Sequence, residues 1–375
     1  MIVYLSVLLV ILISGEAYKV SANKCRHSEL PEGDRGRKRY IVLVSALLAL
    51  QSGLRHWAVG ADTYNYYESH FEPTMTRTWS DIFRSVYVYL AEGQGKDPGY
   101  AVIEKLTQYI TPHYQLFLLL IAVAFFAALG RFIYIHTTTV SDAELAFVLY
   151  YTLFFDFFSL TGHRQTIATA ITLFAYELVT RRRALLFFPI ILVASVIHKS
   201  VLGYMILYFV APIKNAKWFG LGVLISVPVV FLYGRPLADM FMRLSGYNYE
   251  AGEAAAYKFT FLLVLFDVVA LWRMQAVLRQ DPEARSVYNA FSVAVLLSPL
   301  IWSLTILIRL VQYFSIFMLL LLPKVVNSFP SKSTYERQAV YYLCIAILLV
   351  LGINAHLDME YAFFWQQMEL PEHYY

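Results

Sequence analysis

Residues 144–180 read ELAFVLYYTLFFDFFSLTGHRQTIATAITLFAYELVT, and the polar residues Gly162, His163, Arg164 and Gln165 separate two apolar runs in this stretch. A guanidinium and an imidazole between two hydrophobic segments are costly to keep in a bilayer, so they are expected where a function requires them. They open the second run, where a helix N-terminus offers free N–H groups and the positive end of its dipole. The stretch therefore predicts two membrane-spanning helices with an anion-binding site at their junction.

The composition of the whole chain supports a membrane protein. Of its 375 residues, 59% are hydrophobic and only 15% are charged, unlike a soluble domain. Apolar runs of roughly 15 to 25 residues recur, each long enough to cross a hydrocarbon core about 30 Å thick. Runs such as residues 343–351 do not alternate as barrel strands do. We expect a single all-α, polytopic membrane domain over residues 1–375 with about twelve transmembrane helices.

The expected spans follow the apolar runs, and two longer polar segments interrupt them. Residues 54–113 predict a large external loop with amphipathic helices, and residues 234–257 predict a second external loop. The expected spans are Met1–Ser14, Tyr40–Gly53, Tyr114–Tyr134, Ala143–Leu160, Arg164–Thr180, Ala184–His198, Val201–Ile213, Trp218–Tyr233, Lys258–Trp272, Val287–Ser303, Thr305–Leu322 and Ala339–Asn354.

Basic residues gather beside the spans, which explains the net charge of +4 without a nucleic-acid-binding surface. The first cluster, which includes Lys19, Arg35, Arg37, Lys38 and Arg39, predicts a basic cytoplasmic loop after the first span. Further clusters at residues 181–183, 214–217, 273–285 and 324–337 fall on the same predicted side. Both termini are then expected outside.

The segment from Arg55 to Tyr67 carries one carboxylate, that of Asp62, directly outside the second expected span. An aspartate beside an anion-binding cleft can act as general base toward a sugar hydroxyl. It can also cap a helix that begins at Thr63, and the two roles are compatible. The aromatic side chains of this region either lie at the headgroup level or stack on sugar rings; they include Tyr64, Tyr67 and Tyr100.

Two arginines are candidates for binding a pyrophosphate group. Arg164 offers a planar fork that suits phosphate oxygens, although it could instead extend to the membrane interface. Arg309 shares a helix face with Gln312 and Tyr313 in an apolar segment, where its burial costs a few kcal/mol unless an anion or a distant carboxylate meets it. The candidate carboxylates are Asp62, Asp97 and Asp267, and the candidate pyrophosphate contacts are Arg164, Arg309, Arg55, Gln165, Lys199 and Tyr313.

The third feature is the polar junction of His198 and Lys199 between two apolar runs. A lone histidine at such a place is ordinarily a capping or packing residue. Here His163 and Arg164 lie on the same predicted face of the membrane, which suggests that both histidines line one cavity. The sequence shows no metal-ligand spacing, no glycine-rich phosphate loop and no nucleotide fingerprint, so we expect no metal and no cofactor.

Several of these motifs together resemble the EpsG-like family of Wzy-type polysaccharide polymerases, which are related in helical architecture to the GT-C integral-membrane glycosyltransferases. The motifs are the segment from Arg55 to Tyr67, the turn from Asp97 to Tyr100, the helix start at Arg164 and Gln165, and the run from Ile197 to Ser200. The resemblance covers roughly residues 1–313; beyond that only the hydropathy is similar.

The resemblance implies a reaction at the outer face of the bacterial inner membrane. A glycan carried on undecaprenyl pyrophosphate would be transferred to the hydroxyl of another lipid-linked repeat unit, as in O-antigen, exopolysaccharide or capsule synthesis. Arg164 and Arg309 would stabilise the leaving pyrophosphate without a metal. Asp62 would be the first candidate for the general base, followed by His198 and His163. A chain-length regulator protein is a candidate partner. A flippase of the lipid-linked oligosaccharide, an O-antigen ligase and a sugar acyltransferase stay open as alternatives.

Overall fold

The protein is represented by a computed structural model that describes residues 1–25, 32–245, 257–330, 333–357 and 359–370. Within these ranges the chain is all-helical, as expected, and its only extended pairing is an isolated bridge between Arg55 and Phe363. The chain divides into two compact units. The first comprises Met1–Ala175, Pro189–Lys199 and Tyr342–Tyr375, and the second comprises Tyr176–Phe188 and Ser200–Tyr341.

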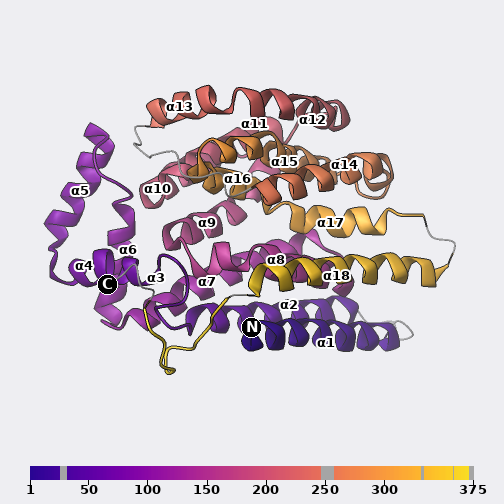
Figure 1. Ribbon diagram of the computed structural model, residues 1–375, viewed down its shortest axis with the longest axis horizontal. Helices are drawn as coiled ribbons and strands as arrows, with labels where there is room; N and C mark the ends of the chain where they lie inside the picture. The colour runs from indigo at the N-terminus through magenta and orange to yellow at the C-terminus, as the bar shows by residue number, and fades with distance from the viewer. Residues whose placement is uncertain (26–31, 246–256, 331–332, 358, 371–375) are drawn as a thin grey trace. The chain divides into compact units, whose positions relative to one another are not determined.

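The first unit contains the N-terminal helices, which Figure 1 draws in indigo to magenta, and the C-terminal part of α18. Its elements are α1 (Ile2–Cys25), α2 (Glu32–Gly53), α3 (Thr63–Tyr66), a π-helical turn (Tyr67–Phe71), α4 (Glu72–Thr76), α5 (Trp79–Glu92), α6 (Gly99–Ile110), α7 (Tyr114–His136), α8 (Val140–Leu153), a second π-helical turn (Asp156–Leu160), α9 (His163–Thr180) as far as Ala175, α10 (Ala184–Ile197) from Pro189, and α18 (Thr334–His356) from Tyr342.

The second unit contains the remaining described helices. Its elements are the end of α9 and the start of α10, a 3₁₀ segment (Lys199–Ile206) from Ser200, α11 (Leu207–Val210), α12 (Ala216–Leu232), α13 (Gly234–Ser245), α14 (Tyr257–Gln280), α15 (Ala284–Leu297), two 3₁₀ turns (Ser298–Trp302 and Thr305–Leu307), α16 (Ile308–Ser315), α17 (Met318–Asn327) and the start of α18. Buried tyrosines and phenylalanines fill its interior, among them Tyr204, Tyr313 and Phe317.

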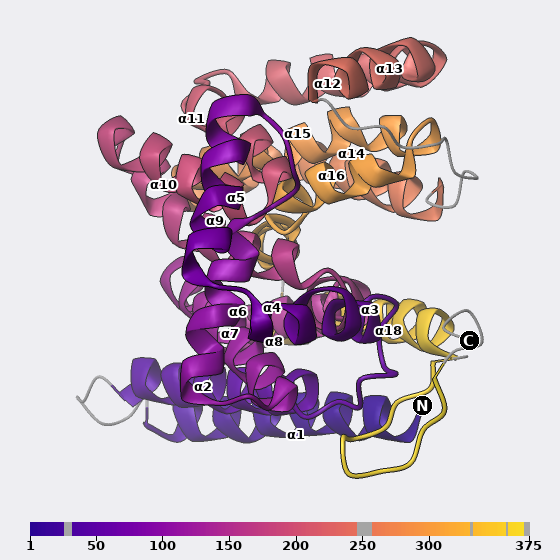
Figure 2. The same cartoon turned by 90° about the vertical axis from the view of Figure 1, so that its left-hand side faces the viewer.

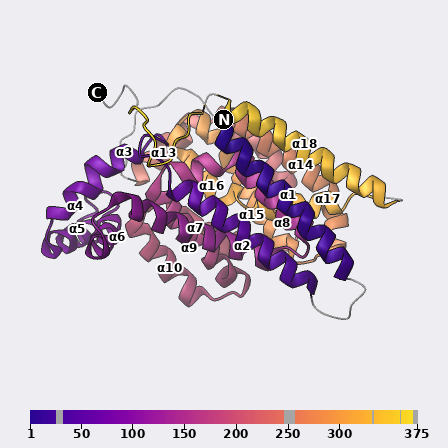
Figure 3. The same cartoon turned by 90° about the horizontal axis from the view of Figure 1, so that it is seen from below.

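The core of the first unit is built on α2, which packs along α7 and against α1 (Figure 3). Close approach is helped by Gly130 of α7, since a Cβ there would lie 2.5 Å from the hydroxyl of Ser45 on α2. Small residues permit such contact between apolar helices. Val44 and Leu48 of α2 are fully buried in this core.

The basic loop expected after the first span is largely helical, so that prediction was wrong. Helix α1 continues to Cys25 and α2 begins at Glu32, and only residues 26–31 between them lie outside the described ranges. Lys19 remains in α1 because it pairs with the fully buried carboxylate of Glu144 on α8, with 2.6 Å between Nζ and Oε2. Gly15 makes room, since a Cβ there would overlap that carboxylate.

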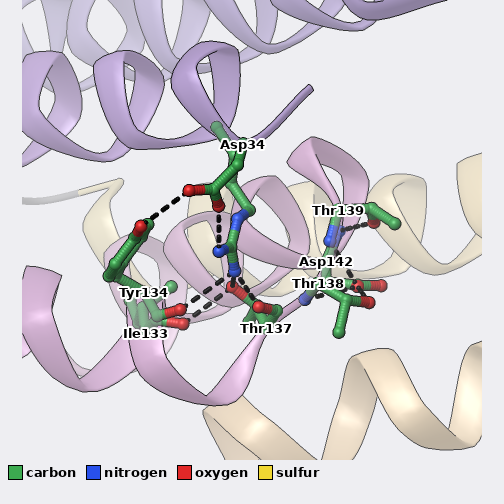
Figure 4. A network of polar contacts seen from close by, with 8 residues as sticks. Asp34, Ile133, Tyr134, Thr137, Thr138, Thr139 and Asp142 are labelled. Atoms are coloured by element: carbon green, nitrogen blue, oxygen red, sulfur yellow. Dashed lines mark hydrogen bonds and ion pairs between the residues drawn. The ribbon is translucent and has the colours of Figure 1, made fainter. Parts of the chain in front are cut away.

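Arg37 shows why the start of α2 is helical despite its charge (Figure 4). Its guanidinium donates to the carbonyl oxygens of Tyr134, at 2.9 Å, and Thr137, and pairs with Asp34 at 2.6 Å. These carbonyls lie at the C-terminal end of α7, where helix carbonyls lack partners and a cation is favourable. Thr139 and Asp142 then form the capping box that begins α8. Arg37 therefore stabilises the C-terminal end of α7.

Among the described residues, five helices are long and apolar enough to cross a bilayer, and the count rises to seven if each of two bent helix pairs forms one span. The five are Ile2–Val20, Tyr114–His136, Tyr257–Gln280, Ala284–Trp302 and Tyr335–His356. The bent pairs are α12 with α13, at 85°, and α16 with α17, at 50°. The expected count of about twelve and the assignment of sides stay predictions.

Several expected spans are interrupted. The expected span over residues 143–160 ends at Leu153 and is followed by a π-helical turn, and the one over 201–213 is a 3₁₀ segment followed by a single α-helical turn. The one over 305–322 breaks between α16 and α17. In the expected second external loop, Gly234–Ser245 is the helix α13, and residues 246–256 lie outside the described part.

Candidate functional site

The polar stretch at the start of α9 is held in place by the break that precedes it. Three successive carbonyls of the π-helical turn accept hydrogen bonds from side-chain hydroxyls: Phe158 from Thr166 at 2.7 Å, Ser159 from Ser52 at 2.6 Å, and Leu160 from Thr63 at 3.1 Å. A continuous helix would have used these carbonyls itself. Ser52 of α2 and Thr63 of α3, together with Thr166 in the first turns of α9, thereby hold the break at the point where α9 begins.

Gly60 allows the loop before α3 to reach this point. Its backbone is left-handed, with φ +91°, and an added Cβ would overlap the carbonyl oxygen of Leu160. Only glycine combines that conformation with that contact at no steric cost. The adjacent Asp62 occupies the N-cap position of α3, but its side chain makes no capping hydrogen bond.

His163 is buried, and its two ring nitrogens have defined roles. Arg55, itself 2% exposed, places its Nη2 atom 2.9 Å from Nε2 of His163. Because a guanidinium can only donate, Nε2 must accept and Nδ1 must carry the proton. Nδ1 faces the hydroxyl of Tyr100 at 3.3 Å, and the imidazole stacks on Tyr66 at 4.6 Å between ring centroids. The lone pair of a neutral His163 is therefore already occupied.

Arg164 makes polar contacts with three different segments. It pairs with Asp97 at 3.2 Å, donates to the hydroxyl of Tyr66 at 3.2 Å, and lies 3.2 Å from Nε2 of His70. Since the guanidinium donates, His70 accepts at Nε2. Burial, followed by the charges of Arg164 and Lys96, lowers the pKa of His70 to about 4. His70 is therefore neutral at physiological pH and carries its proton on Nδ1.

Asp97 joins three elements. Its carboxylate accepts from Arg164 of α9, from Nδ1 of His198 at 3.3 Å and from the backbone N–H of Lys199 at 3.0 Å. Burial alone would raise the pKa of Asp97, but the hydrogen bond from His198 and the charges of His198 and Arg164 hold it below its usual value. Its φ is +51°. A left-handed aspartate is uncommon, and such strain often marks functional sites.

A cavity of about 470 Å³ opens beside this cluster, between α5, the start of α6 and the start of α9. Figure 1 shows α5 and α6 at its left edge, and they face the viewer in Figure 2. Four cations and two carboxylates line the cavity, together with the neutral His70 and with Tyr100: the cations are Arg77, Arg84, Lys96 and Arg164, and the carboxylates are Asp81 and Asp97. A concave site with more cations than carboxylates attracts anions.

The structure brings together part of the predicted site. Arg164, His163, Arg55 and Tyr100 are connected by hydrogen bonds and ring contacts, and Asp97 links this group to His198 and to the backbone of Lys199. Of the predicted residues, Arg164, Tyr100 and the candidate carboxylate Asp97 line the cavity.

Other predicted residues lie elsewhere. Asp62 is half-buried and does not line the cavity, and Tyr64 and Tyr67 pack with Trp57 instead. Gln165 is buried in α9. Arg309 and Tyr313 belong to the second unit, where Tyr313 is buried and its hydroxyl lies 3.3 Å from that of Ser200.

The sequence alone missed His70, Arg77, Arg84 and Lys96, and it did not connect Asp97 with Arg164. His70 and Arg84 are ordinary polar positions of helical turns, and Arg77 and Lys96 lie in connections between helices, so no local signal marks them. Asp97 stands before Pro98 and Gly99, and a Cβ on Gly99 would lie 3.0 Å from the backbone of Val196 in α10. That close approach brings Asp97 to His198. Among the described residues no group of three or more His, Cys, Asp and Glu side chains could hold a metal.

Comparison with known protein families gives one result that decides the family. The family model of EpsG matches residues 38–367. The chain belongs to the EpsG family. The matched range includes Arg55, Asp97, Arg164, His198 and Arg309, and thus every element of the candidate site. EpsG membership and the apolar helices make the chain a membrane protein of polysaccharide biosynthesis with a glycosyltransferase-like character. No curated protein matches the chain, and no solved structure matches it.

Proposed function

We propose that this EpsG protein is a polysaccharide polymerase that transfers a glycan from undecaprenyl pyrophosphate to the hydroxyl of another lipid-linked repeat unit. The reaction takes place at the outer face of the bacterial inner membrane, within a GT-C-like bundle of about twelve spans. The observation that carries the proposal is the cation-lined cavity with Arg164, at the N-terminus of α9, in its wall. Such a site suits a pyrophosphate.

The reaction breaks the bond between the anomeric carbon and the pyrophosphate oxygen and forms a bond from that carbon to the acceptor oxygen. Negative charge develops on the leaving pyrophosphate, and preorganised donors lower the barrier by stabilising that charge. Arg164 supplies a guanidinium that Asp97, Tyr66 and His70 hold in place. His70 also lines the cavity, and its Nδ1–H is a further candidate donor to the pyrophosphate. Arg309, Arg55, Gln165, Lys199 and Tyr313 stay candidate contacts of the same group.

The acceptor hydroxyl must lose its proton, and the geometry favours His198 as the base. Asp97 accepts from Nδ1 of His198, so that Nε2 carries the lone pair of the neutral ring, as in a carboxylate-oriented catalytic histidine. The lone pair of His163 is taken by Arg55. Neither residue lines the cavity; Asp62 is the second candidate because His198 shares Asp97 with Arg164, whereas Asp62 stands at the N-cap of α3. Tyr64, Tyr67 and Tyr100 are proposed to contact sugars.

The test is to replace Arg164 by glutamine in the native host, with Arg39→Gln as the matched control. Arg39 is an exposed arginine of α2. At equal protein abundance, Arg164→Gln should shorten the surface glycan and cause single repeat units to accumulate on the lipid carrier, whereas Arg39→Gln should leave chain length normal. Normal chain length in Arg164→Gln would contradict the proposal.

Two other outcomes would assign a different function. Accumulation of the single units only on the cytoplasmic leaflet would identify a flippase. Full-length polymer that stays on the lipid carrier would identify a ligase. The corresponding variants of Asp62, His198 and Arg309 should behave as Arg164→Gln does if these residues act in the transfer.

A further inference from the structure

We infer that the cavity has a second anion subsite, formed by Arg77 and Arg84 of the α5 wall, that binds the carboxylate of an acidic sugar in the glycan. The inference rests on the proposed function, because it assumes that a pyrophosphate-linked glycan enters this cavity. It adds the chemical class of the repeat unit, an acidic one.

The guanidinium of Arg77 is held in position by the helix that follows it. Its Nη2 atom donates to the hydroxyl of Ser85 at 2.7 Å, and that hydroxyl donates to the carbonyl of Asp81 at 2.9 Å. Ser85, Arg77 and Arg84 all line the cavity. An oriented guanidinium presents its remaining N–H groups as a planar fork, which matches the two oxygens of a carboxylate.

The two carboxylates of the cavity are engaged elsewhere. Asp81 accepts from the backbone N–H and the hydroxyl of Thr78, at 3.1 and 2.6 Å, in the capping box of α5. Asp97 is engaged by Arg164, His198 and Lys199. In the part of the chain that the structure describes, neither Arg77 nor Arg84 forms an ion pair. Asp81 interacts electrostatically with both arginines and offsets part of their charge, and the remainder is available to a ligand.

The cations of the cavity fall into two groups, and a pyrophosphate at Arg164 would occupy only one of them. Four cations and two carboxylates line the wall, a net charge of +2, and Asp97 pairs with Arg164. Arg164 and His70 stand together at the start of α9, while Arg77 and Arg84 belong to α5 and the residues just before it. A volume of about 470 Å³ lies in the range of sites that enclose a small-molecule ligand. An anion carried by the glycan itself accounts for the second group.

The inference can be tested by binding to the purified full-length protein in nanodiscs. The probes are two short-chain polyprenyl pyrophosphate disaccharides that differ only in the distal sugar, glucuronate in one and glucose in the other. The wild-type protein should bind the glucuronate probe about tenfold more tightly, as one charge-assisted contact provides. The double variant Arg77→Gln/Arg84→Gln should lose this preference, and Arg39→Gln should keep it.

Each other outcome has a defined meaning. Equal wild-type affinity for the two probes would overturn the inference, and so would an equal loss for both probes in the double variant, which would indicate a general electrostatic or lipid-headgroup role. Arg164→Gln should lower the affinity for both probes equally. If it lowers neither affinity, the proposed pyrophosphate site is contradicted, while the preference for glucuronate can still be measured. The double variant Arg77→Lys/Arg84→Lys keeps the positive charge without the planar guanidinium, so it should retain part of the preference for glucuronate. Its binding of the probes would also show that the variant protein is folded.

Discussion

Replacement of Asp97 by asparagine tests the reasoning that builds the site. The carboxylate of Asp97 accepts from Arg164 at 3.2 Å, from His198 at 3.3 Å and from the backbone of Lys199 at 3.0 Å, and its side chain is fully buried. Asparagine has nearly the same shape but no charge and one acceptor oxygen fewer. Arg164, whose side chain is 10% exposed, would lose the only carboxylate that pairs with it in the described part of the chain.

The structure sets the expected magnitude. Removal of one partner of a buried ion pair costs about 3–5 kcal/mol when the other charge stays buried. Arg164 keeps its bonds to Tyr66 and His70 and lines the cavity, and asparagine can still accept from Lys199. We therefore expect Asp97→Asn to lower the free energy of unfolding by about 3 kcal/mol, the lower end of this range.

The assay is equilibrium unfolding of the purified protein in detergent over a range of pH, with Asp239→Asn as the control. Asp239 is an exposed aspartate of α13. Because the pKa of folded Asp97 lies below its usual value, its contribution to stability is present above the ordinary carboxyl pKa of about 3.9 and is lost as the pH falls through the lowered folded value. The deficit of Asp97→Asn should be present at neutral pH and shrink in acid. A deficit under about 0.5 kcal/mol at neutral pH, within the range of surface substitutions, would refute the proposed role of Asp97.

Two further predictions concern the surroundings of the site. Gly60→Ala should destabilise the protein in thermal unfolding by more than Gly93→Ala does. Both glycines have a left-handed backbone, but only at Gly60 would the added Cβ meet the backbone of Leu160. Gly93→Ala should therefore cost only the left-handed strain, about 1 kcal/mol. Equal costs would contradict the packing described. Burial raises the pKa of Glu104 to about 8, so the folded protein holds this proton and loses stability as the pH rises from about 4.3 through 8. Glu104→Gln should therefore be more stable than wild type at pH values above about 8 and equally stable below about pH 4, and no difference at alkaline pH would contradict a neutral buried acid.

The apolar runs were sufficient to predict most helices, because a chain in a bilayer must satisfy its backbone hydrogen bonds within each segment. The expected segments Tyr114–Tyr134, Arg164–Thr180 and Trp218–Tyr233 correspond to α7, α9 and α12 within a few residues. The sequence misplaced the start of α2 and missed the break after Leu153. In both cases the deciding groups lie far along the chain, such as the carbonyls of Tyr134 and Thr137 that hold Arg37.

By itself, the sequence determined that this is a helical membrane protein of the EpsG type and that Arg164 stands at a helix start between apolar runs, because composition, hydrophobic length and residue order are local properties. Only the tertiary structure decided what surrounds Arg164. Folding brought Asp97 and His70 from a distant polar segment to that arginine. It also placed the guanidinium of Arg55 against Nε2 of His163, so that the lone pair of this nitrogen accepts from Arg55. The physical reason is that a buried charge takes the partners that folding brings within hydrogen-bond distance, and separation along the chain does not reveal them.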